Sequence, residues 1–265
     1  MRSRTAWRRR PFSRYVLLLL ALVAVGGFYA GVDDNAPRAE AANTPSKQQI
    51  AEGKRLFETN CATCHGMSGQ GTKTGPNLYG SGAAAVDFQV GTGRMPLAQP
   101  GAQAPRKEPK FTQKQIDAMA AYVASLSAGP EVPKNVEGDY KDADLALGGE
   151  LFRANCAQCH NFAGSGGALT NGKYAPELTG VQSKHIYEAM ETGPENMPVF
   201  GERTLTRDEK LAVIRYIKTI EEEPNPGGAG LGRVGPVSEG LVVWLVGIGL
   251  CVVAAMWITA KKKTD

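Results

Sequence analysis

The sequence predicts a mainly helical fold of two tandem domains, followed by a membrane helix at the C-terminal end. Three observations lead to this expectation. The motif Cys-x-x-Cys-His occurs twice, an amphipathic segment follows each copy, and the stretch from Leu241 to Ala260 is apolar and uncharged. A motif repeated at this interval in 265 residues indicates two domains of roughly 80 to 100 residues each.

The repeated motif predicts the cofactor. The two copies are Cys61-Ala-Thr-Cys64-His65 and Cys156-Ala-Gln-Cys159-His160. Two thiols one helical turn apart can form thioethers with the two vinyl groups of haem, while the adjacent imidazole binds the iron. A redox dithiol or a zinc site also uses Cys-x-x-Cys, but neither needs a histidine directly after it. We therefore expect two covalently bound haem c groups.

The N-terminal segment is typical of an export signal. Several arginines precede an apolar run from Tyr15 to Ala30, which predicts a helix over about 15–32. The small-residue stretch Ala39-Glu40-Ala41 could be a cleavage site, but it lies several residues beyond the apolar run. A cleaved signal and a retained anchor both remain open, and we prefer the retained anchor.

Each half of the repeat is expected to begin with a short helix that ends at its motif and to close on an amphipathic helix. The closing helices are predicted at Thr112–Leu126 and Thr206–Ile220, and each opens with a capping box. Tyr122 and Tyr216 fall at matching positions, where each should contact the opening helix or the haem edge.

Segments without apolar periodicity divide the chain. The expected parts are an N-terminal segment at 1–42, a first domain at 43–128, a connection at 129–143, a second domain at 144–223, a flexible tether at 224–240, a membrane helix at 241–260 and a tail at 261–265. The segment Pro96–Lys110 has no counterpart of equal length in the second half. It could be a docking loop, although we favour a mobile surface insertion.

The C-terminal apolar run is predicted to cross the membrane. Trp244 and Trp257 lie near its two ends, lysines follow it, and it lacks the polar face of a buried core helix. Basic clusters outside both apolar runs predict cytoplasmic termini and haem domains on the outer side of the cell membrane. The net charge of +4 comes from these ends, so a lipid bilayer is an expected partner and nucleic acid is not.

Methionines are the best candidates for the sixth iron ligand, which a pure electron carrier benefits from having. Met95 is the candidate for the first haem. Met190 follows His160 at the spacing by which Met95 follows His65, whereas the aligned Thr-Gly pairs set Met197 against Met95. A proline after Met95 and after Met197 favours a loop, which suits a ligand. We prefer Met197 for the second haem and keep Met190 as the alternative.

His185 is the third histidine of the chain. We expect it on a helix from Ser183 to Glu191, as a surface or hydrogen-bonded residue rather than an iron ligand.

The segments after the two motifs resemble small soluble cytochromes c, in which a proline follows the haem motif. The resemblance implies class I cytochrome c folds, with the carbonyls of Pro76 and Pro176 accepting the proximal imidazole N–H.

The whole chain resembles the dihaem cytochrome c subunit of the actinobacterial cytochrome bc complex, a proton-translocating menaquinol:cytochrome c reductase. The order of parts carries the resemblance: an arginine-rich apolar N-terminus, two tandem c domains and one C-terminal membrane helix ending in lysines. It implies an electron carrier without catalytic residues of its own. The implied partners are the Rieske iron-sulfur and cytochrome b subunits, and a haem-copper cytochrome c oxidase in a supercomplex.

Two alternative functions are considered. The electron-input subunit of a cbb-type oxidase, or of another membrane dehydrogenase, is less consistent with a C-terminal anchor. A dihaem peroxidase needs an open iron position, and a Met-Pro pair in each half argues against one.

Overall fold

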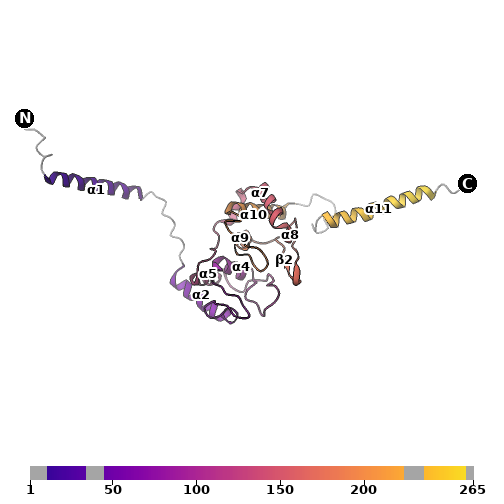
Figure 1. The fold of residues 1–265 in the computed structure, drawn as a ribbon, viewed down its shortest axis with the longest axis horizontal. Coiled ribbons are helices and arrows are strands. Elements are labelled where there is room, and N and C mark those ends of the chain that lie inside the picture. The colour runs from indigo at the N-terminus through magenta and orange to yellow at the C-terminus, as the bar shows by residue number, and fades with distance from the viewer. Residues whose placement is uncertain (1–10, 34–44, 224–235, 261–265) are drawn as a thin grey trace, which may run out of the picture. The chain divides into compact units, whose positions relative to one another are not determined.

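The computed structural model describes residues 11–33, 45–223 and 236–260 and is mainly helical (Figure 1). The chain forms two units, residues 1–45 and 46–265. In the first unit, α1 spans Pro11–Asp33, and its apolar part, Arg14–Gly27, is shorter than a membrane span. The Ala39-Glu40-Ala41 stretch lies outside the described residues.

The first domain consists of α2 to α5 and contains the first Cys-x-x-Cys-His motif. Its helices are α2 (Lys47–Asn60), α3 (Ala62–His65), α4 (Gly82–Gly91) and α5 (Gln113–Leu126). Helices α2 and α5 cross so closely at Gly53 that a Cβ there would lie 1.9 Å from the Ala118 carbonyl oxygen. Phe57 and Tyr122 stack beside this crossing with ring centroids 5.2 Å apart, which confirms the predicted contact of Tyr122 with the opening helix.

The second domain repeats this arrangement. Its elements are α6 (Val136–Asp139), η2 (Tyr140–Asp142), α7 (Leu145–Asn155), α8 (Ala157–His160), β1 (Gly167–Ala168), η3 (Thr170–Gly172), β2 (Tyr174–Ala175), α9 (Ser183–Thr192) and α10 (Arg207–Glu222). Gly148 on α7 meets the Ala212 carbonyl of α10 as Gly53 meets Ala118, again 1.9 Å from a would-be Cβ. Phe152 and Tyr216 repeat the ring contact at 5.2 Å. Strands β1 and β2 form a short antiparallel hairpin.

Both predicted capping boxes are confirmed. The Thr112 side chain pairs with Gln115 and that of Thr206 with Glu209 at the first turns of α5 and α10. A capping box satisfies backbone donors that have no partner within the helix, so each closing helix begins at a defined residue.

Two expectations about connecting segments need correction. The predicted connection at 129–143 is structured over its second half, because Val136 is 2 % exposed and belongs to the apolar core of the second domain. The end of the predicted tether, 236–240, is helical, because α11 begins at Pro236. The rest of the predicted tether, 224–235, lies outside the described residues.

The Pro96–Lys110 segment, called the docking loop below, is exposed over most of its length as expected of a surface insertion, but it is held against the second domain and is not the mobile segment that we favoured. The Gln103 side chain donates to the Tyr174 carbonyl oxygen at 2.7 Å and accepts from the Tyr174 N–H at 3.0 Å. The Ala104 N–H donates to Glu195 Oε1 at 2.7 Å. These bonds fasten a first-domain loop to the second domain. Helices α4 and α9 also pack against each other, with Lys184 Nζ 2.6 Å from Asp87 Oδ2.

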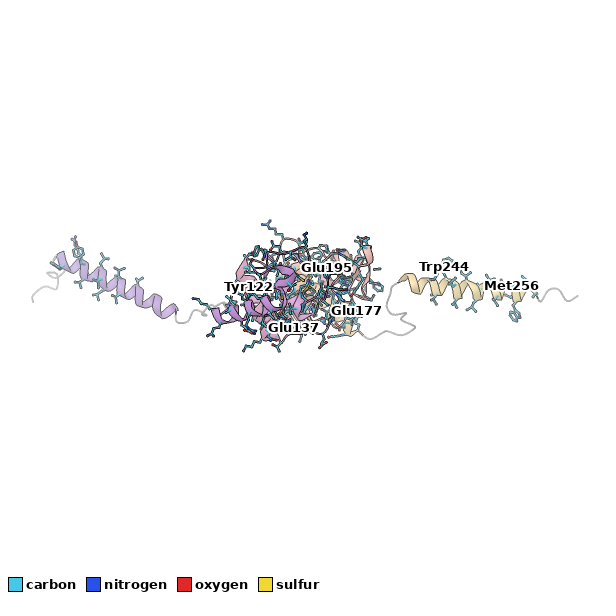
Figure 2. The ribbon with its side chains drawn as sticks, turned by 90° about the horizontal axis from the view of Figure 1, so that it is seen from below. Tyr122, Glu137, Glu177, Glu195, Trp244 and Met256 are labelled. Carbon is cyan, nitrogen blue, oxygen red and sulfur yellow. The ribbon has the colours of Figure 1, made fainter. Side chains whose placement is uncertain are left out.

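Helix α11 spans Pro236–Ala260, and from Gly240 onwards it is long and apolar enough to cross a bilayer. Figure 2 shows Trp244 and Met256 projecting from this helix. Large apolar side chains are exposed along its length, which suits a lipid environment better than water.

Candidate functional site

The first Cys-x-x-Cys-His motif lies at the end of α2, where the chain turns into α3. The ring nitrogen Nδ1 of His65 lies 2.8 Å from the carbonyl oxygen of Pro76. Because Nδ1–H donates to this oxygen, Nε2 is the nitrogen left to bind a metal. Glycine at position 75 lets the chain before Pro76 pass close to the motif, since a Cβ there would lie 2.5 Å from the Cys64 carbonyl oxygen.

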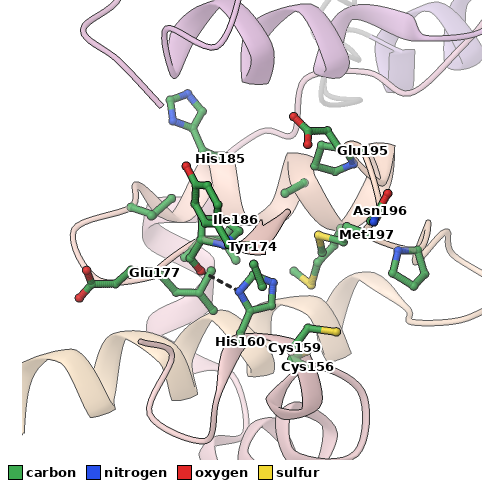
Figure 3. Close-up of a pocket in the computed structure, with 18 of the residues that line it drawn as sticks. Cys156, Cys159, His160, Tyr174, Glu177, His185, Ile186, Glu195, Asn196 and Met197 are labelled. Atoms are coloured by element: carbon green, nitrogen blue, oxygen red, sulfur yellow. Dashed lines mark hydrogen bonds between the residues drawn. The ribbon is translucent and has the colours of Figure 1, made fainter. Parts of the chain in front are cut away.

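The second motif has the same geometry between α7 and α8. The Nδ1 atom of His160 lies 2.9 Å from the carbonyl oxygen of Pro176, drawn as the dashed line in Figure 3. The predicted acceptor role of both proline carbonyls is therefore confirmed. Burial lowers the pKa of His160, while the bond to Pro176 opposes that shift, so the neutral imidazole needed for metal binding is favoured.

The first cysteine of each motif has a raised thiol pKa, which does not suit a redox dithiol. Burial raises the pKa of Cys61 and of Cys156 to about 11, and the second cysteine of each motif adds to the shift. Reactive dithiols depend on a lowered thiol pKa, so these cysteines are poor redox catalysts. Covalent anchoring of a cofactor agrees better with this chemistry.

A cavity of about 1250 Å³, part of it open to solvent, lies beside the second motif. Cys156, Cys159 and His160 lie on its wall, and most of the other lining residues are apolar. Figure 3 shows His160, Cys159 and Met197 around this cavity. The apolar walls and the donor set fit a covalently bound haem.

The three candidate methionines differ in their surroundings. Met190 and Met197 both line the cavity of the second site. Met190 lies on α9 and is 2 % exposed, whereas Met197 lies in the loop after α9 and is half-buried. In the first domain, Met95 lies in the loop after α4 and packs against the apolar core beside Phe111.

Residues of the first domain complete the cavity of the second site, which sequence reasoning did not foresee. They come from α4 and from the loop that follows it. The five are Phe88, Thr92, Arg94, Gln103 and Arg106. The signal was available in part, because the long insertion at Pro96–Lys110 combines prolines with basic residues.

The expectation of His185 as a surface or hydrogen-bonded residue was wrong. It lies on α9 as predicted, but it is 7 % exposed and its Nε2 atom has no hydrogen-bond partner among the described residues. The reason is that α4 of the first domain covers this part of α9, so that Phe88 meets the His185 ring edge-on. Burial, followed by the charge of Lys184, lowers the pKa of His185 to about 4.

Two carboxyl groups are buried with His185. Asp87 is 1 % and Glu188 is 0 % exposed, and His185 Nε2 lies 4.0 Å from an oxygen of each. Neither Glu188 oxygen meets a donor in the described part of the chain. Burial raises the pKa of Glu188 to about 10, and the neighbouring Asp87 adds to the shift. The pair therefore holds one proton between its two carboxyl groups, and Lys184 neutralises the remaining charge.

Comparison with known proteins gives the same organisation. Residues 50–127 match the cytochrome c family, and residues 143–217 match the family described as cytochrome c oxidase, cbb3-type, subunit III. Each match covers one domain and includes one Cys-x-x-Cys-His motif. Two cytochrome c domains bring two covalently bound haem c groups.

Full-length relatives are similar over nearly the whole chain. The cytochrome bc1 complex cytochrome c subunit of Mycobacterium bovis is 46 % identical, over 98 % of this chain and 95 % of its own length. The corresponding subunit of Corynebacterium diphtheriae is 47 % identical, over 96 % of this chain and 97 % of its own. The cbb3-type cytochrome c oxidase subunit FixP of Azorhizobium caulinodans is 29 % identical over 70 % of this chain and 65 % of its own.

Identity at this level, with both haem motifs and the C-terminal apolar helix included in the matched length, is decisive for the family. The chain belongs to the cytochrome c subunits of the cytochrome bc1 complex, a quinol–cytochrome c reductase, and is an electron carrier with two haem c groups.

Proposed function

We propose that this subunit carries electrons from the Rieske iron-sulfur protein of a menaquinol-oxidising complex to a haem-copper cytochrome c oxidase in aerobic respiration. The first haem receives the electron and the second passes it on. The observation that carries the proposal is the lining of the second haem cavity, to which the first domain contributes five residues. A second haem site that is lined in part by the first domain keeps the two domains together within one chain, as a relay without a diffusing carrier requires.

The residues of each haem site follow from the motifs and the geometry. Haem when bound supplies the one-electron chemistry, and the protein holds it and sets its potential. We assign the thioether bonds to Cys61 and Cys64 in the first domain and to Cys156 and Cys159 in the second. His65 and His160 bind the two irons through Nε2, since Nδ1 donates to a proline carbonyl in each case.

Met95 and Met197 are assigned as the residues that would supply a further ligand to the first and the second iron. A thioether ligand raises the haem potential, as required between an iron-sulfur donor and a copper acceptor. Met197 is favoured over Met190 because Met197 lies in a loop between Pro194 and Pro198. Met190 is fixed in α9, and its carbonyl oxygen accepts from the Phe200 N–H at 2.7 Å.

Met197→Leu is expected to weaken the near-infrared band that marks methionine ligation, by removing the contribution of the second haem and leaving that of the first. Leucine preserves the apolar volume but cannot bind iron, so a ligand role and a packing role are separated. Near-infrared absorption of the oxidised protein measures the effect. Met190→Leu is the matched control, because it makes the same change in the same cavity. If the band is weakened in Met190→Leu and keeps its full intensity in Met197→Leu, then Met190 and not Met197 is the ligand.

The topology belongs to the same proposal. Helix α11 anchors the subunit in the cell membrane, and the haem domains lie on the outer side. With a retained α1 the chain would cross twice and both termini would be cytoplasmic. The basic clusters that support this orientation lie partly outside the described residues.

Gentle purification through this subunit tests the proposed partners. Solubilised in a mild detergent, it should bring down the Rieske and cytochrome b subunits together with oxidase subunits, identified by mass spectrometry. Recovery with oxidase subunits alone would support the alternative function, the electron-input subunit of an oxidase; the match of residues 143–217 to the cbb3-type subunit III family is consistent with that alternative. Recovery of the subunit alone would contradict a fixed relay.

A further inference from the structure

The second haem cavity has a basic edge that is supplied by the first domain. Arg94 and Arg106 both line the cavity, Arg94 half-buried and Arg106 exposed at its opening. Both residues belong to the segment that begins at the end of α4 and continues into the docking loop.

The docking loop holds both arginines against the second domain at several points. Gln103 pairs with the backbone of Tyr174 on β2, two residues before the carbonyl that orients His160. Arg106 Nη2 donates to the Gly180 carbonyl oxygen at 3.3 Å. The loop is therefore fixed relative to the second iron site.

Arg94 is held by an aromatic ring. Its guanidinium carbon lies 4.7 Å from the centroid of the Phe88 ring, and Phe88 itself lines the cavity. Stacking on a ring leaves the N–H groups at the guanidinium edge available to an acceptor in the guanidinium plane.

Lys173, another cation on this cavity, already donates to Asn196 Oδ1 at 2.8 Å. Arg106 also donates, to the Gly180 carbonyl oxygen, but a guanidinium has five N–H donors, so both arginines can still bind a carboxylate in the cavity. Haem carries two propionate carboxylates, and guanidinium groups bind carboxylates through paired hydrogen bonds.

We propose that Arg94 and Arg106 of the first domain bind the propionates of the second haem, so that the second haem site is completed by the first domain. The proposal rests on the haem assignment made under Proposed function. It gives the docking loop a binding role and makes the potential of the second haem depend on contact between the domains.

The proposal also connects the two haem sites through the backbone. Arg94 directly precedes Met95, the assigned ligand of the first iron. One residue would therefore contact the second haem while the next binds the first iron. A short covalent path of this kind favours rapid electron exchange between the two sites.

Arg94→Gln, Arg106→Gln and the double variant test the proposal in the full-length protein in detergent. Removing a positive charge beside a propionate favours the oxidised haem, so the potential of the second haem should fall. For the double variant we expect at least a tenfold lower equilibrium constant for reduction, which corresponds to about 59 mV. Spectroelectrochemical titration gives the potential, and the propionate bending band in resonance Raman spectra reports the hydrogen bonds directly.

Lys107→Gln is the matched control, because it removes the same charge from the same loop at a residue outside the cavity lining. Arg106→Lys keeps the charge but loses the paired geometry, so its Raman band should shift while its potential changes little. Arginine variants that shift neither potential nor Raman band beyond Lys107→Gln would overturn the proposal. A pyridine haemochrome assay on every variant should give two haems per chain. A value of one for the wild type would instead overturn the haem assignment.

Discussion

Gly148→Ala is expected to lower the thermal midpoint of the second domain by roughly 4–8 °C or more and to reduce haem attachment at Cys156 and Cys159. The added Cβ would lie 1.9 Å from the carbonyl oxygen and 2.5 Å from the carbonyl carbon of Ala212. Both are backbone atoms of α10, so no side chain can move aside. Separating two packed helices costs about 2 kcal/mol or more, which exceeds the roughly 1 kcal/mol gained from replacing glycine in a helix.

Thermal unfolding followed by near-ultraviolet and Soret circular dichroism measures this effect. Gly138→Ala is the control, since Gly138 lies on the short helix α6 and a Cβ there would meet nothing within 4 Å. Gly53→Ala should repeat the loss in the first domain, because the contact with Ala118 is equivalent. A stable Gly148→Ala protein with two haems would show that the α7–α10 crossing tolerates a wider separation.

Glu188→Gln is expected to stabilise the protein above pH 7 and to remove most of its loss of stability with rising pH. In the folded chain the pKa of Glu188 is raised to about 10 from an ordinary value of 4.5, first by burial and then by Asp87. Between these values the folded state binds one proton more than the unfolded state. Stability therefore falls as pH rises, by up to about 1.4 kcal/mol per pH unit. Glutamine keeps the neutral form at every pH.

His185 makes stability depend on pH in the opposite direction, over a lower range of pH. Its pKa is lowered from 6.5 to about 4, first by burial, with Lys184, Arg94 and Arg106 also lowering it and Asp87 opposing them. Between those values the unfolded state binds the extra proton, so stability rises with pH. Between about pH 4.5 and 6.5 the effects of Glu188 and His185 on stability cancel. Above that range stability is expected to fall with rising pH because of Glu188.

Denaturant midpoints measured from pH 5 to pH 9 test both statements. Glu191→Gln is the matched control, because it makes the same change one turn further along α9. Glu191 pairs with the fully buried Lys210 at 2.6 Å, so its loss should lower stability without removing the decline above pH 7. If Glu188→Gln keeps the wild-type decline, then Glu188 is ionised in the folded protein.

Local chemistry made much of this structure predictable from the sequence. The haem motifs, the capping boxes at Thr112 and Thr206, and the proline carbonyls that orient His65 and His160 depend on residues near one another along the chain or on the repeat. The apolar stripes of the closing helices predicted which faces are buried, because burial of an amphipathic face follows its period.

The contact between the two domains was not predictable in the same way. Asp87 lies within the mostly apolar stretch Gly82–Gly91, and Glu188 lies between Tyr187 and Met190, both of which are buried. In each case a polar residue on a buried helix face indicated that this face meets a polar partner. Their partner, however, is a helix in the other domain, and no periodicity within one helix reports such a pairing. The Pro96–Lys110 segment was misjudged for the same reason, since its hydrogen bonds reach residues more than seventy positions away.

The docking loop has a consequence for how the chain is assembled. A chain synthesised from its N-terminus completes the first domain before the second exists. Until then Gln103 and the Ala104 N–H lack the backbone and carboxylate groups that they bind in the finished protein, and Asp87 lacks the Lys184 ammonium. The second domain therefore completes the first, and maturation of the chain ends only when the later domain closes over the earlier one.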